Sequence, residues 1–452
     1  MEKTHMIIRD KGFYLRVVTL MLPVALQSLI TMGVNLADNI MVGQLGDLQL
    51  SAATLANQFT NLYMILGMGI GGGAGVLTAQ YFGMKDGRAL KQTIALMFRI
   101  DLVVSVIFMT GTVLFPAQIM RIYTTNEDVI AYGVQYFYFL RTTFICHIFT
   151  LTVTQVLRSV KIVKVPLYAS LASFFVNIFF NWVFIFGNLG APRMEIAGAA
   201  VGTMLARILE MIIIVGYLLF RDKVIGFRLK DILMPASARL SAYIRYSLPV
   251  IVSDCLLGLG NNALSVVMGH ISAEFVAASS ITVMTVQICS MLSMASATAS
   301  TSMVGNAIGE GKREYVQRQG VTFLMISVII GAAASILLLL LNSTIIGLYD
   351  VSAYTKELAE QMMDAVAIIV LFRCTGSMLT KGVLRAGGDT KFLMFGDIFF
   401  LWAVSIPLGS TAGLVWHLPV FWTYLILQSD NFFKTVLCAI RLFSGKWIQK
   451  IG

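Results

Sequence analysis

Long apolar segments, separated by short charged or Pro/Gly-rich breaks, recur from one end of the chain to the other. About 20 helical residues cross the ~30 Å hydrocarbon core of a bilayer, so segments of this length are typical of membrane spans. Because every backbone polar group must be paired inside lipid, the spans are expected to be helices. The pattern predicts an all-α membrane protein with twelve spans, at 15–42, 50–80, 93–116, 129–156, 164–187, 195–220, 243–269, 275–304, 319–347, 356–381, 391–414 and 418–442.

The composition supports this interpretation. Of 452 residues, 58% are hydrophobic and 12% are charged, and the mean hydropathy is +0.82. A soluble domain carries about 25% charged residues. These values exclude a soluble enzyme, a nucleic-acid binder and a secreted scaffold. The five cysteines lie within apolar segments and the four histidines are scattered, so neither a disulfide framework nor a metal cluster is expected.

The basic residues of the loops lie mainly on one side of the predicted spans. If the N-terminus is cytoplasmic, the inner segments carry 25 Lys and Arg residues, and the outer loops carry three, Arg121, Arg193 and Lys356. Cytoplasmic loops are the basic ones, so both termini are expected in the cytoplasm. This orientation requires an even number of spans.

The second half of the chain repeats landmarks of the first. Pro23 recurs as Pro249, each within a Leu-Pro-Val sequence, and the same offset of 226 residues relates Asn35 to Asn261. One constant offset across several landmarks indicates an internal duplication. We therefore expect two six-helix lobes.

The predicted lobes are 1–220 and 243–452, joined by a basic cytoplasmic loop at 221–242. Because six is an even number, both lobes enter the membrane in the same sense. Duplications of this kind are common in secondary transporters, whose binding sites lie where the repeats meet.

Asp38, in the first span, lacks a local base. No Lys or Arg occurs between Arg16 and Lys85, and Asp38 lies about five residues, or roughly 7 Å, below the outer end of its helix. Desolvation disfavours the ionised form, so the carboxyl group must find a partner or take up a proton. It could hold a proton, a sodium ion or an organic cation; a solvated acid near the outer interface is the alternative. The repeat places Leu264 at the equivalent position, so the scaffold does not require an acid.

Asn177 and Asn181 lie four residues apart in the fifth span and therefore share a helix face. Two carboxamides on one face could coordinate a cation through their oxygens or orient a carboxyl group. The alternative is hydrogen bonding between helices, which Asn commonly provides in membranes. Thr203, in the sixth span, is a weaker candidate because threonine often bonds its own helix backbone.

Other charged residues within spans have local explanations. Arg207 and Glu210, and likewise Asp430 and Lys434, are spaced to meet on one helix face and neutralise each other. A second group consists of Arg99 and Asp101, which are expected near the inner end of their span, where side chains can reach the interface.

In the second half, Asp254 is in the middle of a span with no local base and is the best further candidate for a cation-binding acid. Asp397 is a second possibility. Asp364 and Asp397 could instead pair with Arg141 or Arg373 across helices, and the sequence does not decide between these partners.

Two nucleotide-binding motifs can be set aside. Gly67–Gly72 fits G-x-G-x-x-G but lies inside a span, where close helix packing by small residues explains it better. No G-x-x-x-x-G-K-[ST] sequence is present, so nothing in the sequence suggests ATP hydrolysis. The energy for transport must then come from an ion gradient or from another subunit; we expect a gradient, with no cofactor and no ATPase subunit.

Several sequences together resemble the multidrug and toxic compound extrusion (MATE) family of the MOP flippase superfamily. Each sequence is only weakly specific by itself, but their order and spacing are specific, and the likeness covers nearly the whole chain. The sequences are Asp38–Gly46, Gln80–Gly83, Gln155–Arg158, Val304–Gly309 and Gly382–Lys391.

The resemblance implies a two-lobed, twelve-helix antiporter that expels organic cations in exchange for H⁺ or Na⁺. The acid of the family's first-lobe cation site maps onto Asp38, its fifth-helix pattern onto Asn177 and Asn181, and its sixth-helix threonine onto Thr203. Asn181 replaces the acid of some members, which leaves Asp38 as the only carboxylate among these four positions.

The sequence therefore predicts a non-enzymatic, multi-pass plasma-membrane protein that acts as a monomer on small organic cations, with Na⁺ at Asp38 as the only possible metal. Alternating access would follow from rocking of the two lobes. The nearest alternative is a flippase for lipid-linked precursors, which needs cationic residues for pyrophosphate; only Arg141, Arg207 and Arg373 are candidates. A membrane-bound transferase or a sensor is not favoured, because neither a clustered catalytic motif nor a soluble output domain is present.

Overall fold

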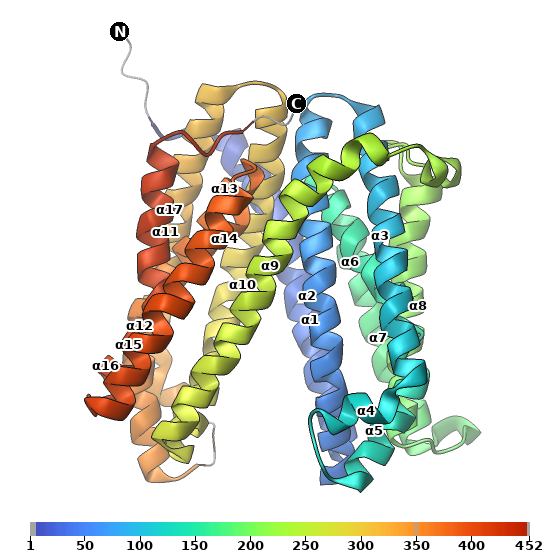
Figure 1. Cartoon of the computed structure of the whole chain (residues 1–452), viewed down its shortest axis with the longest axis vertical. Coiled ribbons are helices and arrows are strands. Elements are labelled where there is room, and N and C mark those ends of the chain that lie inside the picture. The colour runs from blue at the N-terminus through green and yellow to red at the C-terminus, as the bar shows by residue number, and fades with distance from the viewer. Residues whose placement is uncertain (1–5, 348, 350, 450–452) are drawn as a thin grey trace. The chain divides into compact units, whose positions relative to one another are not determined.

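The computed structural model describes residues 6–347, 349 and 351–449, and every element within them is a helix (Figure 1). The prediction of an all-α protein is confirmed. In chain order the helices are α1 (Lys11–Gly43), α2 (Asp47–Gly83), α3 (Gly87–Leu114), α4 (Pro116–Arg121), α5 (Glu127–Leu140), α6 (Thr143–Ser159), α7 (Lys164–Phe186), η1 (Asn188–Gly190), α8 (Ile196–Gly216), η2 (Tyr217–Arg221), η3 (Leu229–Leu233), α9 (Ser237–Ile271), α10 (Ala273–Gly309), α11 (Arg313–Gly347), α12 (Ala353–Ser377), η4 (Met378–Val383), α13 (Leu384–Ala386), α14 (Thr390–Phe399), η5 (Phe400–Ser405), α15 (Ile406–Ser410), η6 (Thr411–Val415), α16 (Val420–Leu427) and α17 (Asp430–Phe443).

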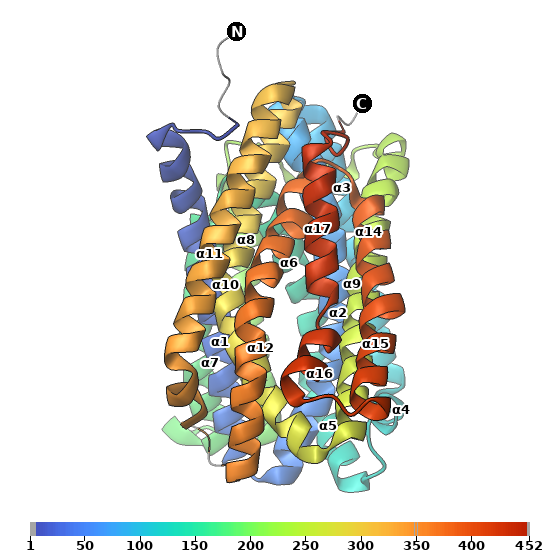
Figure 2. The ribbon, with the colours of Figure 1, turned by 90° about the vertical axis from the view of Figure 1, so that its left-hand side faces the viewer.

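Ten continuous helical segments among the described residues are long and apolar enough to cross a membrane. The predicted span 129–156 is broken into α5 and α6, which are bent by 59° relative to each other; counted together as one span, they bring the number to eleven among the described residues. The last predicted span, 418–442, is split into α16 and α17 (Figure 2). This last stretch carries charged residues in its second helix, which lowers its hydropathy. The predicted count of twelve is therefore close to what the structure shows.

The chain forms two compact units by its internal contacts. Unit 1 contains Met1–Ala25, Gly83–Lys85 and Val252–Gly452, and unit 2 contains Leu26–Phe82 and Asp86–Ile251. The divisions lie inside α1 and α9, shortly after the proline within each helix. The lobe boundaries inferred from the sequence repeat stay a prediction.

Small residues allow the helices of unit 2 to pack closely. The backbone of Gly71 on α2 lies against Thr152 of α6, where an added Cβ would come within 3.1 Å of the threonine Cα. On α8, a Cβ at Gly198 or Gly202 would meet the backbone of α7 or a side chain on it. The run of small residues on α2 therefore has the packing role expected of it.

The loop predicted at 221–242 is held against the first turns of α3. Lys91 Nζ lies 3.0 Å from Asp231, and the Arg99 guanidinium donates to the backbone carbonyls of Ile232 and Met234 at 2.9 and 2.6 Å. Burial alone would raise the pKa of Asp231, but the hydrogen bonds from Lys91 and from the Arg228 N–H outweigh it and lower the pKa below its ordinary value. The pair is therefore ionised at neutral pH.

Candidate functional site

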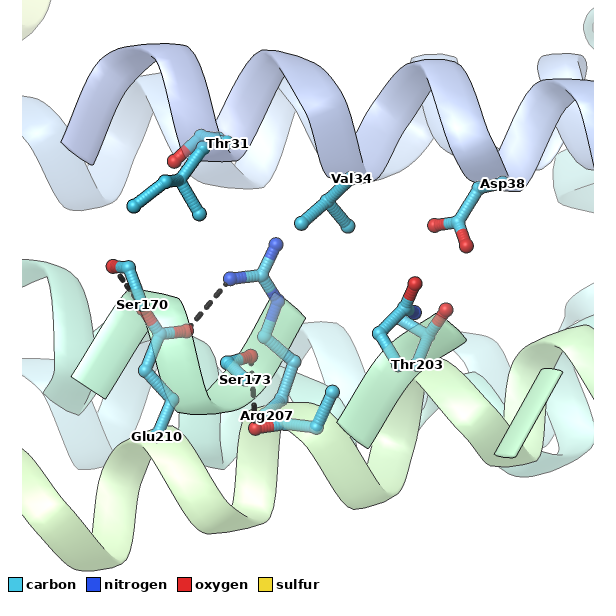
Figure 3. A pocket seen from close by; sticks show the side chains of 11 residues that line it. Thr31, Val34, Asp38, Ser170, Ser173, Thr203, Arg207 and Glu210 are labelled. Carbon is cyan, nitrogen blue, oxygen red and sulfur yellow. Dashed lines mark hydrogen bonds and ion pairs between the residues drawn. The ribbon is translucent and has the colours of Figure 1, made fainter. Parts of the chain in front are cut away.

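Three helices of unit 2 present polar faces to one cavity (Figure 3). On each helix the lining positions recur every three or four residues, which is the spacing of a single helix face. The lining residues are Ile30, Thr31, Val34 and Asp38 of α1, Ser170, Ser173 and Asn177 of α7, and Thr203, Ala206, Arg207 and Glu210 of α8.

Asp38 lies at this cavity and is held by an amide rather than by a base. Asn181 Nδ2 donates to Asp38 Oδ1 at 2.5 Å, and the same nitrogen lies 3.4 Å from Asn177 Oδ1. Both asparagines are almost fully buried, whereas Asp38 is partly exposed. No Lys, Arg or His nitrogen of the described residues lies within 4.0 Å of the Asp38 carboxylate. The structure thus brings together the acid and the two carboxamides that the sequence singled out.

The close contact between α7 and α8 fixes the position of the Asn181 amide. Gly202 of α8 faces Asn181, and a Cβ at this position would overlap the amide oxygen. The next residue, Thr203, lines the cavity opposite Asp38 (Figure 3). The buried hydroxyl of Tyr136 on α5 interacts with Thr203 and with Asn57. Tyr136 was not identified from the sequence, because nothing in the pattern of α5 distinguishes it from a core aromatic residue.

Arg207 and Glu210 form the predicted ion pair, with 2.8 Å between Arg207 Nη1 and Glu210 Oε2. They also line the cavity that contains Asp38, a position that was not predicted from the sequence (Figure 3). The signal was present, since Thr203, Arg207 and Glu210 follow one another at helical spacing on α8. The cavity therefore contains two carboxyl groups and one guanidinium.

A chain of hydrogen bonds continues from this ion pair to the end of α6. Ser170 donates to Glu210 Oε1 at 3.0 Å, Gln27 Nε2 donates to Ser170 at 2.9 Å, and Arg158 donates to Gln27 Oε1 at 2.6 Å. The carboxylate of Glu210 is thus bonded on both sides and held in place. Among the described residues, Asp38 has amide partners but no charged donor within 4.0 Å.

The cavity is small in this conformation. Its volume is about 30 Å³, and a single water molecule needs roughly 10–15 Å³. Sites for drug-sized ligands measure about 300–1,000 Å³. The cavity as it stands therefore admits water or a small cation, and a larger ligand requires it to open.

The two acids proposed for a second site each have a basic partner. Asp254 lies 3.8 Å from Arg385, and Asp397 lies 3.3 Å from Lys434 and accepts from Ser253 at 2.8 Å. Asp254 has no base near it along its own helix, as the sequence indicates, but folding brings Arg385 of α13 to it from a distant part of the chain. Neither acid resembles Asp38 in its surroundings.

The structure also gives the surroundings of three other charged groups considered in the sequence. Lys434 lies 3.7 Å from Asp430, as predicted, but its shorter contact is with Asp397. Asp364 accepts a hydrogen bond from Asn342 at 3.3 Å. Asp101 does not reach the interface: it is fully buried in the middle of α3, because its side chain points towards α6 rather than towards the loop.

The family model described as MatE matches residues 23–183 and 249–411, which is more than half of the chain. This chain belongs to the MatE family. The two matched segments begin at Pro23 and at Pro249, in agreement with the duplication inferred from the sequence. The chain is therefore a multi-pass membrane transporter of that family.

Relatives with assigned names agree with this membership. The chain is 25% identical over 400 residues to a probable multidrug resistance protein NorM of Rhizobium meliloti, covering 85% of each protein. It is 21% identical over 445 residues to the uncharacterized transporter YisQ of Bacillus subtilis, covering 98% of this chain and 96% of the relative.

Solved structures of the family share the fold. A mutant of the Vibrio cholerae MATE transporter VcmN matches with a TM-score of 0.87 at 15% identity, covering 96% of this chain and 97% of that one. A MOP superfamily transporter of Pyrococcus furiosus, described as having a binding pocket of reverse polarity that suggests a different function, matches with a TM-score of 0.86 at 19% identity, covering 95% and 96%.

The ion pair in the cavity yields a testable expectation for stability. Arg207→Met leaves Glu210 charged and without its base, and removing one partner of a buried pair costs about 3–5 kcal/mol. Since Arg207 is 20% exposed, we expect a loss near the lower end of this range. The double variant Arg207→Met/Glu210→Gln should recover most of the loss in a thermal unfolding measurement; equal losses in both variants would contradict the assignment of the pair.

Proposed function

We propose that this MatE family transporter is a secondary antiporter that exports organic cations from the cytoplasm in exchange for a cation moving inward. Asp38 is the residue at which the exported cation and the coupling ion compete. The observation that supports this most directly is that Asp38 has an amide partner but no base within 4.0 Å in the described part of the chain, so its charge is available to a ligand.

The charges of the cavity favour the exchange of single positive charges. With Asp38 ionised, two carboxylates face one guanidinium, and the net charge is one negative unit. With Asp38 protonated, the net charge is zero. Glu210 does not take part in this change, because Arg207 and Ser170 occupy its two oxygens. One proton therefore replaces one monovalent cation.

A proton is the coupling ion that needs the fewest ligands at this site. It needs a single carboxyl oxygen, and the Asn181 N–H already occupies the other. Na⁺ would be held by Asp38, Asn177 and Thr203 oxygens, all of which line the cavity. We propose H⁺ as the coupling ion, with Na⁺ as the alternative that the experiment below distinguishes.

The cycle follows from differential affinity of the two conformations for the two ligands. In the outward-open state a proton binds Asp38 and displaces the exported cation. The two lobes then rock, the cavity opens inward, and the proton is released and replaced by a new organic cation. The small cavity of this structure is consistent with an occluded or ion-sized state of the site.

Transport of a pyrophosphate-linked lipid fits the site less well. Such a ligand needs several free cationic groups, whereas Arg207 is paired with Glu210 and Arg141 stacks at 4.2 Å on the Tyr138 ring. The cavity also carries more negative than positive groups.

We further propose that both termini are cytoplasmic, that the protein lies in the plasma membrane, and that it acts as a monomer. The excess of basic residues on one side supports the orientation. The residues of the cavity all come from one unit, so the proposed exchange needs no residue from a second copy of the chain. Labelling of cysteines introduced near the two ends, in intact and in opened cells, tests the orientation.

The experiment that tests the function is efflux of a cationic dye from proteoliposomes under an imposed proton gradient or an imposed sodium gradient. We expect the proton gradient to drive efflux and the sodium gradient to have little effect. Efflux under the sodium gradient alone would show that Na⁺, and not H⁺, is the coupling ion. The absence of efflux under both gradients would refute the antiporter assignment.

A further inference from the structure

Asp101 is a buried acidic residue of unit 2. It has no role in the transport mechanism proposed above. It lies in the middle of α3, with 0% of its surface exposed. No ion pair to it occurs within 4.0 Å among the described residues. A fully buried carboxyl group without a counter-charge is costly to keep ionised.

The hydrogen bonds around Asp101 indicate which form it takes. Thr152 Oγ1 of α6 lies 2.6 Å from Asp101 Oδ2 and 2.8 Å from the backbone oxygen of Ile148. A hydroxyl group has one hydrogen and cannot donate to both acceptors. If Asp101 carries a proton, it donates to Thr152 Oγ1, and the threonine hydrogen is free for Ile148.

Among the residues that the structure describes, no other group donates a hydrogen bond to Asp101. Its second oxygen, Oδ1, is buried and has no hydrogen-bond partner. The neighbouring hydroxyls of Tyr63 on α2 and Tyr243 on α9 interact electrostatically with Asp101, but they donate to the backbone carbonyls of Phe144 and Ile70. The nearby guanidinium of Arg99 is directed to the loop carbonyls.

We infer that Asp101 is a second proton-binding site, separate from Asp38, which holds a proton in this conformation and exchanges it during the transport cycle. An asparagine at this position would be neutral without a proton and could also donate to Thr152. An acid differs from it mainly in being able to lose the proton. The role in the cycle rests on the proposed proton-driven function.

A second proton-binding site changes the net charge that moves across the membrane in each transport cycle. Exchange at Asp38 alone moves one proton inward for each monovalent cation exported, and no net charge crosses the membrane. A second proton carried by Asp101 moves one net positive charge inward per cycle. Transport by the natural protein should therefore generate an electric current, and Asp101→Asn should remove the current while dye efflux continues under a pH gradient.

The test uses proteoliposomes adsorbed on a solid-supported membrane, with a monovalent cationic dye. We expect a dye-dependent current from the natural protein, none from Asp101→Asn, and preserved dye efflux in that variant. Asp364→Asn is the matched control, since it makes the same change in another span outside this cluster, and its current should be unchanged. A current in Asp101→Asn equal to that of the natural protein would overturn the proposed exchange.

Infrared spectroscopy provides a second readout that does not depend on transport. The carbonyl band of a protonated carboxyl group should be present at neutral pH in the natural protein and absent in Asp101→Asn. In Thr152→Val the band should shift, because the hydroxyl that accepts the proton is removed. Identical spectra for the natural protein and Asp101→Asn would overturn the assignment of the proton. If the natural protein shows this band but no dye efflux, the antiport function and the proton exchange at Asp101 are both refuted. Only the protonation of Asp101 is then supported.

Discussion

Asp38→Asn is expected to reduce gradient-driven efflux of a cationic dye to the background level. Asparagine keeps the size of the side chain and a partner for Asn181, but it neither carries a negative charge nor takes up a proton. The exported cation and the coupling ion then lose the group for which they compete. Efflux from everted vesicles, normalised to the amount of protein in the membrane, measures the effect.

The control for this variant is Asp364→Asn, the same chemical change on α12, where the acid is exposed and accepts a hydrogen bond from Asn342. Its efflux should stay close to that of the natural protein. Undiminished efflux by Asp38→Asn would refute the role given to Asp38, and an equal loss in Asp364→Asn would show that the assay reports membrane insertion rather than the site.

Gly202→Ala should also reduce efflux strongly, although it adds only one methyl group. The new Cβ would overlap Asn181 Oδ1 and come within 3.0 Å of the Asn181 backbone nitrogen. Either the amide must leave Asp38 or α8 must move away from α7, and both changes disturb the site. We expect a loss on the order of tenfold or more in efflux, as displacements of about 1 Å at a functional site can cost a hundredfold.

Gly216→Ala, at the end of the same helix, is the matched control. An added Cβ there meets nothing within 4 Å, and alanine is the better helix former. This variant should keep full efflux and unchanged or slightly raised thermal stability. Normal efflux by Gly202→Ala, with the variant correctly inserted, would contradict the view that the position of the Asn181 amide matters.

The sequence predicted the membrane class, most spans and the group formed by Asp38, Asn177, Asn181 and Thr203. The spans could be predicted because hydropathy is a local property, and Asp38 because an acid without a local base is visible along the chain. The expectation that the four residues form one site came from the resemblance to the MATE family. The spacing of the asparagines defined a helix face, and the fold placed that face towards Asp38.

The features that the sequence did not predict depend on contacts between distant segments. Asp254 acquires its base from Arg385, and Asp101 is turned towards Thr152 rather than towards the loop. The Arg207–Glu210 pair was recognised from its spacing, but its position at the cavity depends on how α8 packs against α7 and α1. Helix breaks such as the one between α5 and α6 also have no clear signal in hydropathy.

Competition between the exported cation and the proton for one carboxyl group can be measured by counting the protons released when a cationic dye binds to the purified protein in weakly buffered detergent solution. We expect dye binding to release protons near the pH at which Asp38 titrates, and Asp38→Asn to abolish this release. Dye binding without any proton release, or the same release from Asp38→Asn, would contradict it.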